Sequence, residues 1–335
     1  MPVTAAEMRS TLILALMFVA TIVLAVLFAR PFSAGCDQPV ETRTDTCLQA
    51  VENPQDVNNV YWYIALILAF TFAILLIAKY GKKWVIRAII LGAVAVTIAY
   101  VAYPLASHAS VLPHAIVGTP SFGYLDAVAL GLAAVVAGGA TLALYKHPEW
   151  YVIDTVGLLV AAASAAIFGI SFGILPVLVL LALLAIYDAI AVYRTKHMLA
   201  LADSVIELRL PVLLVIPKHR GYHFREEASK FKQASAANKA EREAMFMGLG
   251  DLVMPTMLVV SALTFGPHGA GSGLSLLLHT PAALGAAVGT LAGFGLLMTF
   301  VLRGNPQAGL PLLNGGAIVG FLAGLYAATG SVKFW

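Results

Sequence analysis

The chain has 335 residues, of which 60% are hydrophobic and 11% are charged, and its mean hydropathy is +0.89. Soluble domains carry about 25% charged residues, so this composition excludes a soluble globular protein and indicates a polytopic membrane protein. The net charge of +3 is small, and the placement of Lys and Arg along the chain is more informative than their sum.

Nine apolar runs are long enough to cross a hydrocarbon core about 30 Å thick, which takes roughly 20 helical residues. We expect an all-α protein, because backbone groups in lipid must bond within their own segment and these runs are too long for barrel strands. The predicted spans are 10–29, 61–78, 84–104, 122–145, 151–170, 172–193, 244–265, 280–302 and 308–329.

The basic residues predict the orientation of these spans. If the N-terminus is cytoplasmic, every Lys and Arg except Arg30, Arg43 and Lys333 falls in an inner segment. Inner loops carry the excess of Lys and Arg, so we predict the N-terminus inside and the C-terminus outside. The chain then divides into a six-span part (1–194), a cytoplasmic loop (195–243) and a three-span part (244–335).

Two loops have distinctive contents. The outer loop, 30–59, carries Cys36 and Cys47, which either form a stabilising disulfide or remain two free thiols. The inner loop contains an apolar segment, 208–217 (LRLPVLLVIP), that is too short to span and favours a strand or an interfacial segment. An exposed strand edge there could pair with an extended peptide, although the basic loop could also be only a topology anchor.

Four acids lie in or against the apolar runs. Asp126 and Asp154 are close to span ends, so we interpret them as caps or interfacial acids. Asp188 and Asp251 lie deeper, where a carboxylate costs roughly 2.5–3.5 kcal/mol on insertion scales and is usually functional. Their distances from the inner ends of two consecutive spans place both about 9–10 Å below the boundary, at one depth on antiparallel neighbours.

Two carboxylates that share a low-dielectric pocket cannot both ionise, so we expect them to hold one proton jointly. One can take a proton from a water while the other polarises a carbonyl, which hydrolyses a peptide without a metal or a covalent intermediate. The chain has no HExxH, no GxSxG and no Cys–His pair in its spans. The alternative is a cation or proton transporter, or a leak channel, that uses the same acids.

Small and aromatic residues adjoin both acids. Gly248 and Gly250 precede Asp251 and would let another helix or a substrate backbone approach closely. Tyr187 precedes Asp188 and could donate a hydrogen bond near the site or simply pack.

The start of the last span is interrupted by helix breakers. Pro306, Gly309 and Pro311 lie at the depth predicted for the two acids. Irregular backbone at membrane depth is tolerated where it lines a water-filled cavity.

Taken together, these motifs resemble those of the presenilin and signal peptide peptidase family of intramembrane aspartyl proteases. The matching residues are Tyr187 and Asp188 in the sixth run, Gly248, Leu249, Gly250 and Asp251 in the seventh, and Leu310 and Pro311 at the start of the ninth. The span count, the orientation and the short chain are most similar to an archaeal presenilin homologue. The family's third motif reads Pro-Ala-Leu, whereas the corresponding residues here are Ala308, Gly309 and Leu310.

The resemblance implies that Asp188 and Asp251 are catalytic and that the substrate is a transmembrane helix, unwound near the cleavage site. It implies a site-shaping or substrate-binding role for Tyr187, Gly248, Leu249, Gly250, Gly309, Leu310 and Pro311. We therefore predict a multi-pass protein of an archaeal cell membrane, with no cofactor, no metal and no nucleic-acid partner.

Overall fold

The computed structural model describes residues 5–33, 51, 53–79, 83–117, 122–195, 213–217, 244–267, 274–303 and 307–332. Cys36, Cys47 and Pro306 lie outside these residues, as does most of the loop 195–243. The predictions that concern them are therefore untested.

Each of the nine predicted runs contains an α-helix. The bounds are α1 Ala5–Ser33, α2 Asn58–Lys79, α3 Lys83–Val117, α4 Phe122–Lys146, α5 Trp150–Ser171, α6 Ile174–Ile190, α9 Leu249–Phe265, α11 Pro281–Val301 and α12 Gly309–Thr329. A π-helical turn, η2 (Ala191–Thr195), extends α6, and a short helix, α10 (Leu274–His279), precedes α11. Among the described residues, seven helices are long and apolar enough to cross a membrane, and α2 and α9 contain shorter apolar stretches. The predicted mostly helical, multi-pass protein is confirmed, while the count of nine spans and their orientation stay predictions.

The seventh run differs from its prediction as a continuous helix. Its first residues form a strand, β2 (Ala244–Gly248), which pairs antiparallel with β1 (Leu213–Pro217). The description of the chain as all-α is therefore wrong for this hairpin. A strand or an interfacial segment was expected for 208–217, and its last five residues form a strand. An extended segment here satisfies its backbone groups through a partner strand, and Gly248 then begins α9 in an extended conformation (φ −68°, ψ 139°).

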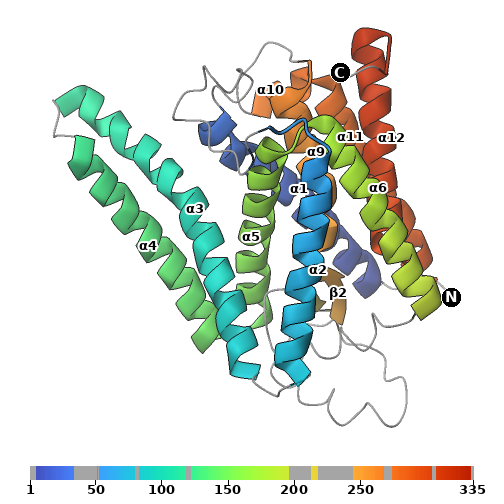
Figure 1. Ribbon diagram of the computed structural model, residues 1–335, viewed down its shortest axis with the longest axis horizontal. Helices are drawn as coiled ribbons and strands as arrows, with labels where there is room; N and C mark the ends of the chain where they lie inside the picture. The colour runs from blue at the N-terminus through green and yellow to red at the C-terminus, as the bar shows by residue number, and fades with distance from the viewer. Residues whose placement is uncertain are drawn as a thin grey trace.

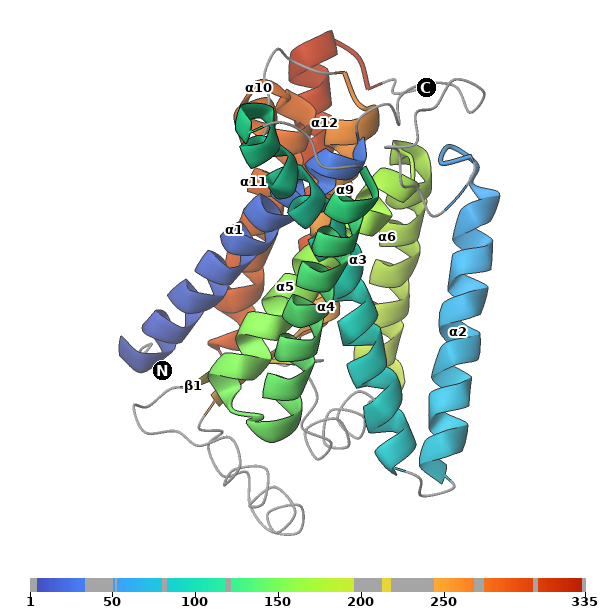
Figure 2. The same ribbon diagram turned by 90° about the vertical axis from the view of Figure 1, so that its left-hand side faces the viewer.

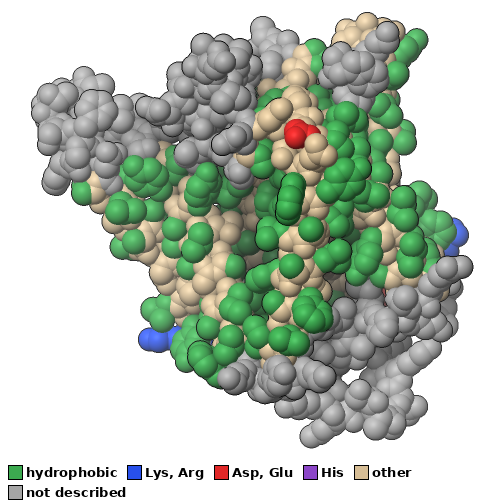
Figure 3. All heavy atoms as spheres, in the orientation of Figure 1, with side chains coloured by type: hydrophobic (Ala, Val, Ile, Leu, Met, Phe, Trp, Pro, Cys, Tyr) green, Lys and Arg blue, Asp and Glu red, His purple; other side chains and the backbone are tan. Residues whose placement is uncertain are grey.

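Helices α1, α5 and α9 form the centre of the bundle, with α6, α11 and α12 packed on one side (Figure 1). The α3–α4 pair leans away on the other side. The hairpin lies at one end of the bundle, the lower end in both views, where Figure 2 shows β1 beside the end of α5. On the face seen in Figure 3, hydrophobic side chains cover the described helices and Lys or Arg appears only at the margins, as expected for contact with lipid.

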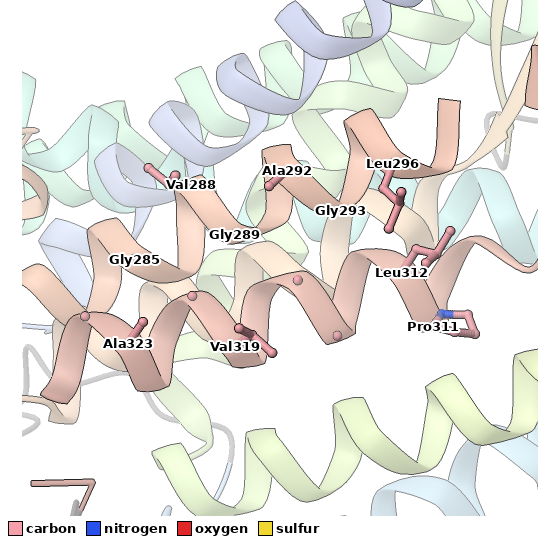
Figure 4. A pocket seen from close by; sticks show the side chains of 14 residues that line it. Gly285, Val288, Gly289, Ala292, Gly293, Leu296, Pro311, Leu312, Val319 and Ala323 are labelled. Carbon is pink, nitrogen blue, oxygen red and sulfur yellow. The ribbon is translucent and has the colours of Figure 1, made fainter. Parts of the chain in front are cut away.

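Helices α11 and α12 make the closest backbone approach. A β-carbon added to Gly285, Gly289 or Gly293 would collide with a backbone carbonyl of α12. An apolar groove of about 600 Å³ follows this seam from Pro311 and Leu312 to Ala323 (Figure 4). Small residues allow this spacing, which is how helices without a hydrophobic driving force between them associate in lipid.

Candidate active site

Asp188 lies in the last turn of α6, and its side chain is only 4% exposed. The helix that carries it is otherwise almost wholly apolar, from Ile174 to Ile190. The side chain faces the bundle, whereas its neighbour Tyr187 is 62% exposed on the outer surface. Consecutive helical residues point about 100° apart, so the two cannot share a face.

Asp251 lies in the first turn of α9 and is partly buried. It follows the strand β2, so the depth expected from seven helical residues after Ala244 does not apply. A β-carbon added to Gly248 would lie 3.5 Å from Oδ2 of Asp251, an ordinary contact, so the role predicted for this glycine stays a prediction. Gly250 is exposed, and nothing lies within 4 Å of the position of its missing β-carbon.

The first turn of α12 lies against both carboxylates. The backbone N–H of Leu310 donates a hydrogen bond of 3.1 Å to Oδ2 of Asp188, and the N–H of Gly309 faces the same carboxylate. A β-carbon added to Gly309 would lie 3.3 Å from Oδ2 and 3.4 Å from Oδ1 of Asp251. The two acids are close enough to interact electrostatically, so α6, α9 and α12 bring one pair of carboxylates to one turn.

The sequence of this turn explains its contact with a carboxylate. The first N–H groups of a helix have no partner within the helix, so Gly309 and Leu310 can donate to a side chain elsewhere. Pro311 has no N–H and is tolerated in a first turn for that reason. An anionic or hydrogen-bond-accepting group is also favoured at a helix N-terminus.

Two further hydrogen bonds join the α6–η2 segment to residues 307–314, at and just before the start of α12. Nδ2 of the fully buried Asn314 donates a hydrogen bond of 3.0 Å to the carbonyl of Leu181. On the outer side of the site, the hydroxyl of Tyr193 donates a hydrogen bond of 2.5 Å to Oε1 of Gln307. Sequence reasoning missed both contacts. Asn314 had a detectable signal, because it is an amide inside an apolar span.

Asp154 does not fit its interpretation as a cap or interfacial acid. It is 5% exposed, and its Oδ1 accepts a hydrogen bond of 2.8 Å from the N–H of Val215 in β1. The interpretation was wrong because nearness to a span end does not predict exposure when a hairpin packs on that end. The side chain of Asp126 is not among those that the structure describes, so its interpretation as a cap or interfacial acid stays a prediction.

Leu249 is the first residue of α9. Its Cδ2 would be 3.3 Å from a β-carbon added to Gly157 of α5, so it packs into a gap that a glycine leaves.

In the described part of the chain, no three His, Cys, Asp or Glu side chains are grouped as in a metal site.

Comparisons with known proteins found a matching family model and similar solved structures. A family model described as signal-peptide peptidase, presenilin aspartyl protease matches residues 14–330. A solved structure of a presenilin family intramembrane aspartate protease, in space group C222, is 36% identical with a TM-score of 0.61, covering 95% of this chain and 98% of that one. Another structure with this description, in space group P2, is 37% identical with a TM-score of 0.60 and covers 94% and 96%. The comparison with curated proteins found no match.

Proposed function

Because the chain belongs to the signal peptide peptidase and presenilin family of intramembrane aspartyl proteases, we propose that Asp188 and Asp251 are its two catalytic acids. The chain is an aspartic endopeptidase that acts on transmembrane substrates within the lipid bilayer. The observation that supports our assignment is the first turn of α12, where Leu310 bonds to one carboxylate and Gly309 packs on the other. The comparisons lend no support to the transporter alternative.

The proposed chemistry uses one water and the two acids. The ionised carboxylate removes a proton from the water, whose oxygen attacks the peptide carbonyl, while the protonated acid donates to the carbonyl oxygen. The resulting gem-diol collapses as its C–N bond breaks: one carboxyl group delivers a proton to the leaving amine, and the other carboxylate takes a proton from a gem-diol hydroxyl to leave the product acid. The pair again holds one proton at the end. The amides of Gly309 and Leu310 keep the Asp188 carboxylate oriented during these transfers.

A helical substrate must open before it can be cut. In lipid its amides are bonded within the helix, so an opened segment needs other partners for its N–H and C=O groups. We propose that the β1–β2 hairpin and the α12 turn receive this extended segment beside the catalytic pair. Replacing residues 208–217 with a Gly/Ser linker should reduce cleavage of helical substrates, and unchanged turnover would contradict this role.

The proposed topology has nine spans, with the N-terminus and the hairpin on the cytoplasmic side. Its support is the distribution of Lys and Arg, of which all but Arg30, Arg43 and Lys333 fall on that side. In this arrangement Tyr187 lies on the outer surface of α6, where a substrate helix approaches from lipid.

The decisive experiment compares the purified wild-type protein with Asp188→Ala and Asp251→Ala on a membrane-helix substrate. We expect cleavage only by the wild type, and inhibition of the wild type by a hydroxyl compound that mimics the gem-diol. Proteolysis that survives either substitution would refute the pair. Ion flux that depends on both acids, without proteolysis, would instead support a transporter.

A further inference from the structure

Of the buried acids among the described residues, Asp154 has no role in the proposed mechanism. It is 5% exposed in the apolar helix α5, where this helix packs against the apolar strand β1. Burying a carboxyl group in such surroundings is unfavourable unless a hydrogen bond compensates. The compensating donor is the N–H of Val215, 61 residues away in sequence.

That hydrogen bond fixes which way the groups of β1 point. Residues of an antiparallel pair direct their N–H and C=O alternately toward and away from the partner strand. The N–H of Val215 points to Asp154, so the groups of Leu214 and Ile216 are those directed to β2, opposite Met247 and Met245. Helix α5 therefore holds β1 from the side that faces away from β2.

The position of β1 is transmitted to the catalytic segment through β2. The register pairs Leu213 with Gly248, the residue at which β2 ends and α9 begins. Gly157, one helical turn beyond Asp154, receives Leu249 and also lies near Leu214. A single face of α5 thus contacts the hairpin and the first residue of the helix that carries Asp251.

We propose that Asp154 is a positioning residue for the protease. Its carboxyl group anchors β1 to α5 and thereby fixes the position of the hairpin and of the Gly248–Asp251 segment relative to Asp188. This inference rests on the proposed catalytic pair. In this role Asp154 takes no direct part in the bond-breaking chemistry. It acts on the rate and on the bond that is cut, through the placement of the hairpin.

The test compares Asp154→Leu, which removes the acceptor, with Asp154→Asn, which keeps an oxygen at the same distance along the side chain. We expect Asp154→Asn to resemble the wild type and Asp154→Leu to lower kcat by about tenfold or more, as loss of a buried acceptor implies. Mass spectrometry of the products should show that the Leu variant spreads cleavage over neighbouring bonds. Thr155→Val is the matched control, because its exposed hydroxyl donates a hydrogen bond to the carbonyl of Tyr151 in the same helix.

Wild-type kcat and wild-type product ends in Asp154→Leu would overturn the proposal. If that variant fails to fold in detergent, a comparison of Asp154→Glu with Asp154→Asn tests the proposal instead, because Glu displaces the acceptor oxygen by one methylene and Asn does not. Altered cleavage sites in the Asp154→Glu variant, together with wild-type cleavage sites in the Asp154→Asn variant, support the proposal. Identical cleavage sites in the two variants overturn it. Loss of all cleavage in Asp188→Ala and Asp251→Ala tests the catalytic pair separately, so failure of either idea is recognised by itself.

Discussion

Gly309 and Asp251 lie so close together that a single added carbon would touch the carboxylate. A β-carbon at Gly309 would lie 3.3 Å from Oδ2 of Asp251, tighter than an ordinary contact. The residue that follows, Leu310, bonds to Asp188. The separation of the two acids therefore depends on the volume of one small residue between them.

We expect Gly309→Ala, which introduces the alanine of the family motif, to lower turnover by about two- to tenfold, because the carboxylate can move a few tenths of an ångström. Gly309→Val should lower it about 100-fold, since a branched side chain must displace the carboxylate farther. Kinetics with a membrane-helix substrate measure both effects, and unchanged melting temperatures would show that the fold is intact. A fully active Val variant would contradict the tight contact.

Neutral replacement of the catalytic acids should separate activity from stability. Asp188→Asn and Asp251→Asn remove the proton chemistry, so we expect turnover to fall by at least about 100-fold. Both variants remove a carboxylate from an apolar site, so the melting temperature should remain the same or rise. Thermal unfolding in detergent measures this. A large fall in melting temperature would mean that the acids also hold the fold together.

Asn314 is expected to affect turnover more than stability. Asn314→Leu removes the hydrogen bond to the Leu181 carbonyl, but it also removes the buried Oδ1, for which no partner is found in the described part of the chain. These two effects on the free energy of unfolding oppose each other, leaving a net change of about 1 kcal/mol or less.

The turn that contacts Asp188 would nevertheless lose its anchor to α6 in this variant, and we expect turnover to fall about tenfold. Gly315→Ala is the control, because nothing lies within 4 Å of the added carbon. Equal turnover in the two variants would show that Asn314 does not position the turn.

The α11–α12 seam should be sensitive to single methyl groups. A β-carbon at Gly289 would collide with the carbonyl of Gly316, so Gly289→Ala should lower the free energy of unfolding by about 1–3 kcal/mol. Gly295→Ala in the same helix meets nothing within 4 Å and should leave stability unchanged or raise it by up to about 1 kcal/mol. Unfolding in detergent measures both, and equal stabilities would show that the helices separate at little cost.

Several features of the site could be predicted from the sequence because they depend on local composition. An acid in an apolar span is costly wherever the span packs, so Asp188 and Asp251 were identifiable without a fold. Helix breakers at the start of the last span likewise marked Gly309 and Pro311. The same criterion, extended from acids to amides, would have marked Asn314.

Other features depended on contacts between distant segments. The run 244–265 is mostly apolar and long enough for one span, but its first five residues form a strand because β1 offers a partner, which no local pattern reveals. Asp154 was assigned to an interface because its burial depends on that hairpin. Tyr187 and Asp188 are neighbours in sequence, and only packing decides that the acid faces inward while the tyrosine is exposed.

By itself, the sequence determined a membrane protein of apolar helices with two costly acids, because hydrophobicity and the cost of burying charge are properties of each segment. Only the tertiary structure decided that the first turn of α12 lies against both acids and that α5 holds the hairpin. Those contacts join residues 122 and 61 positions apart, and they form only when separate helices pack together.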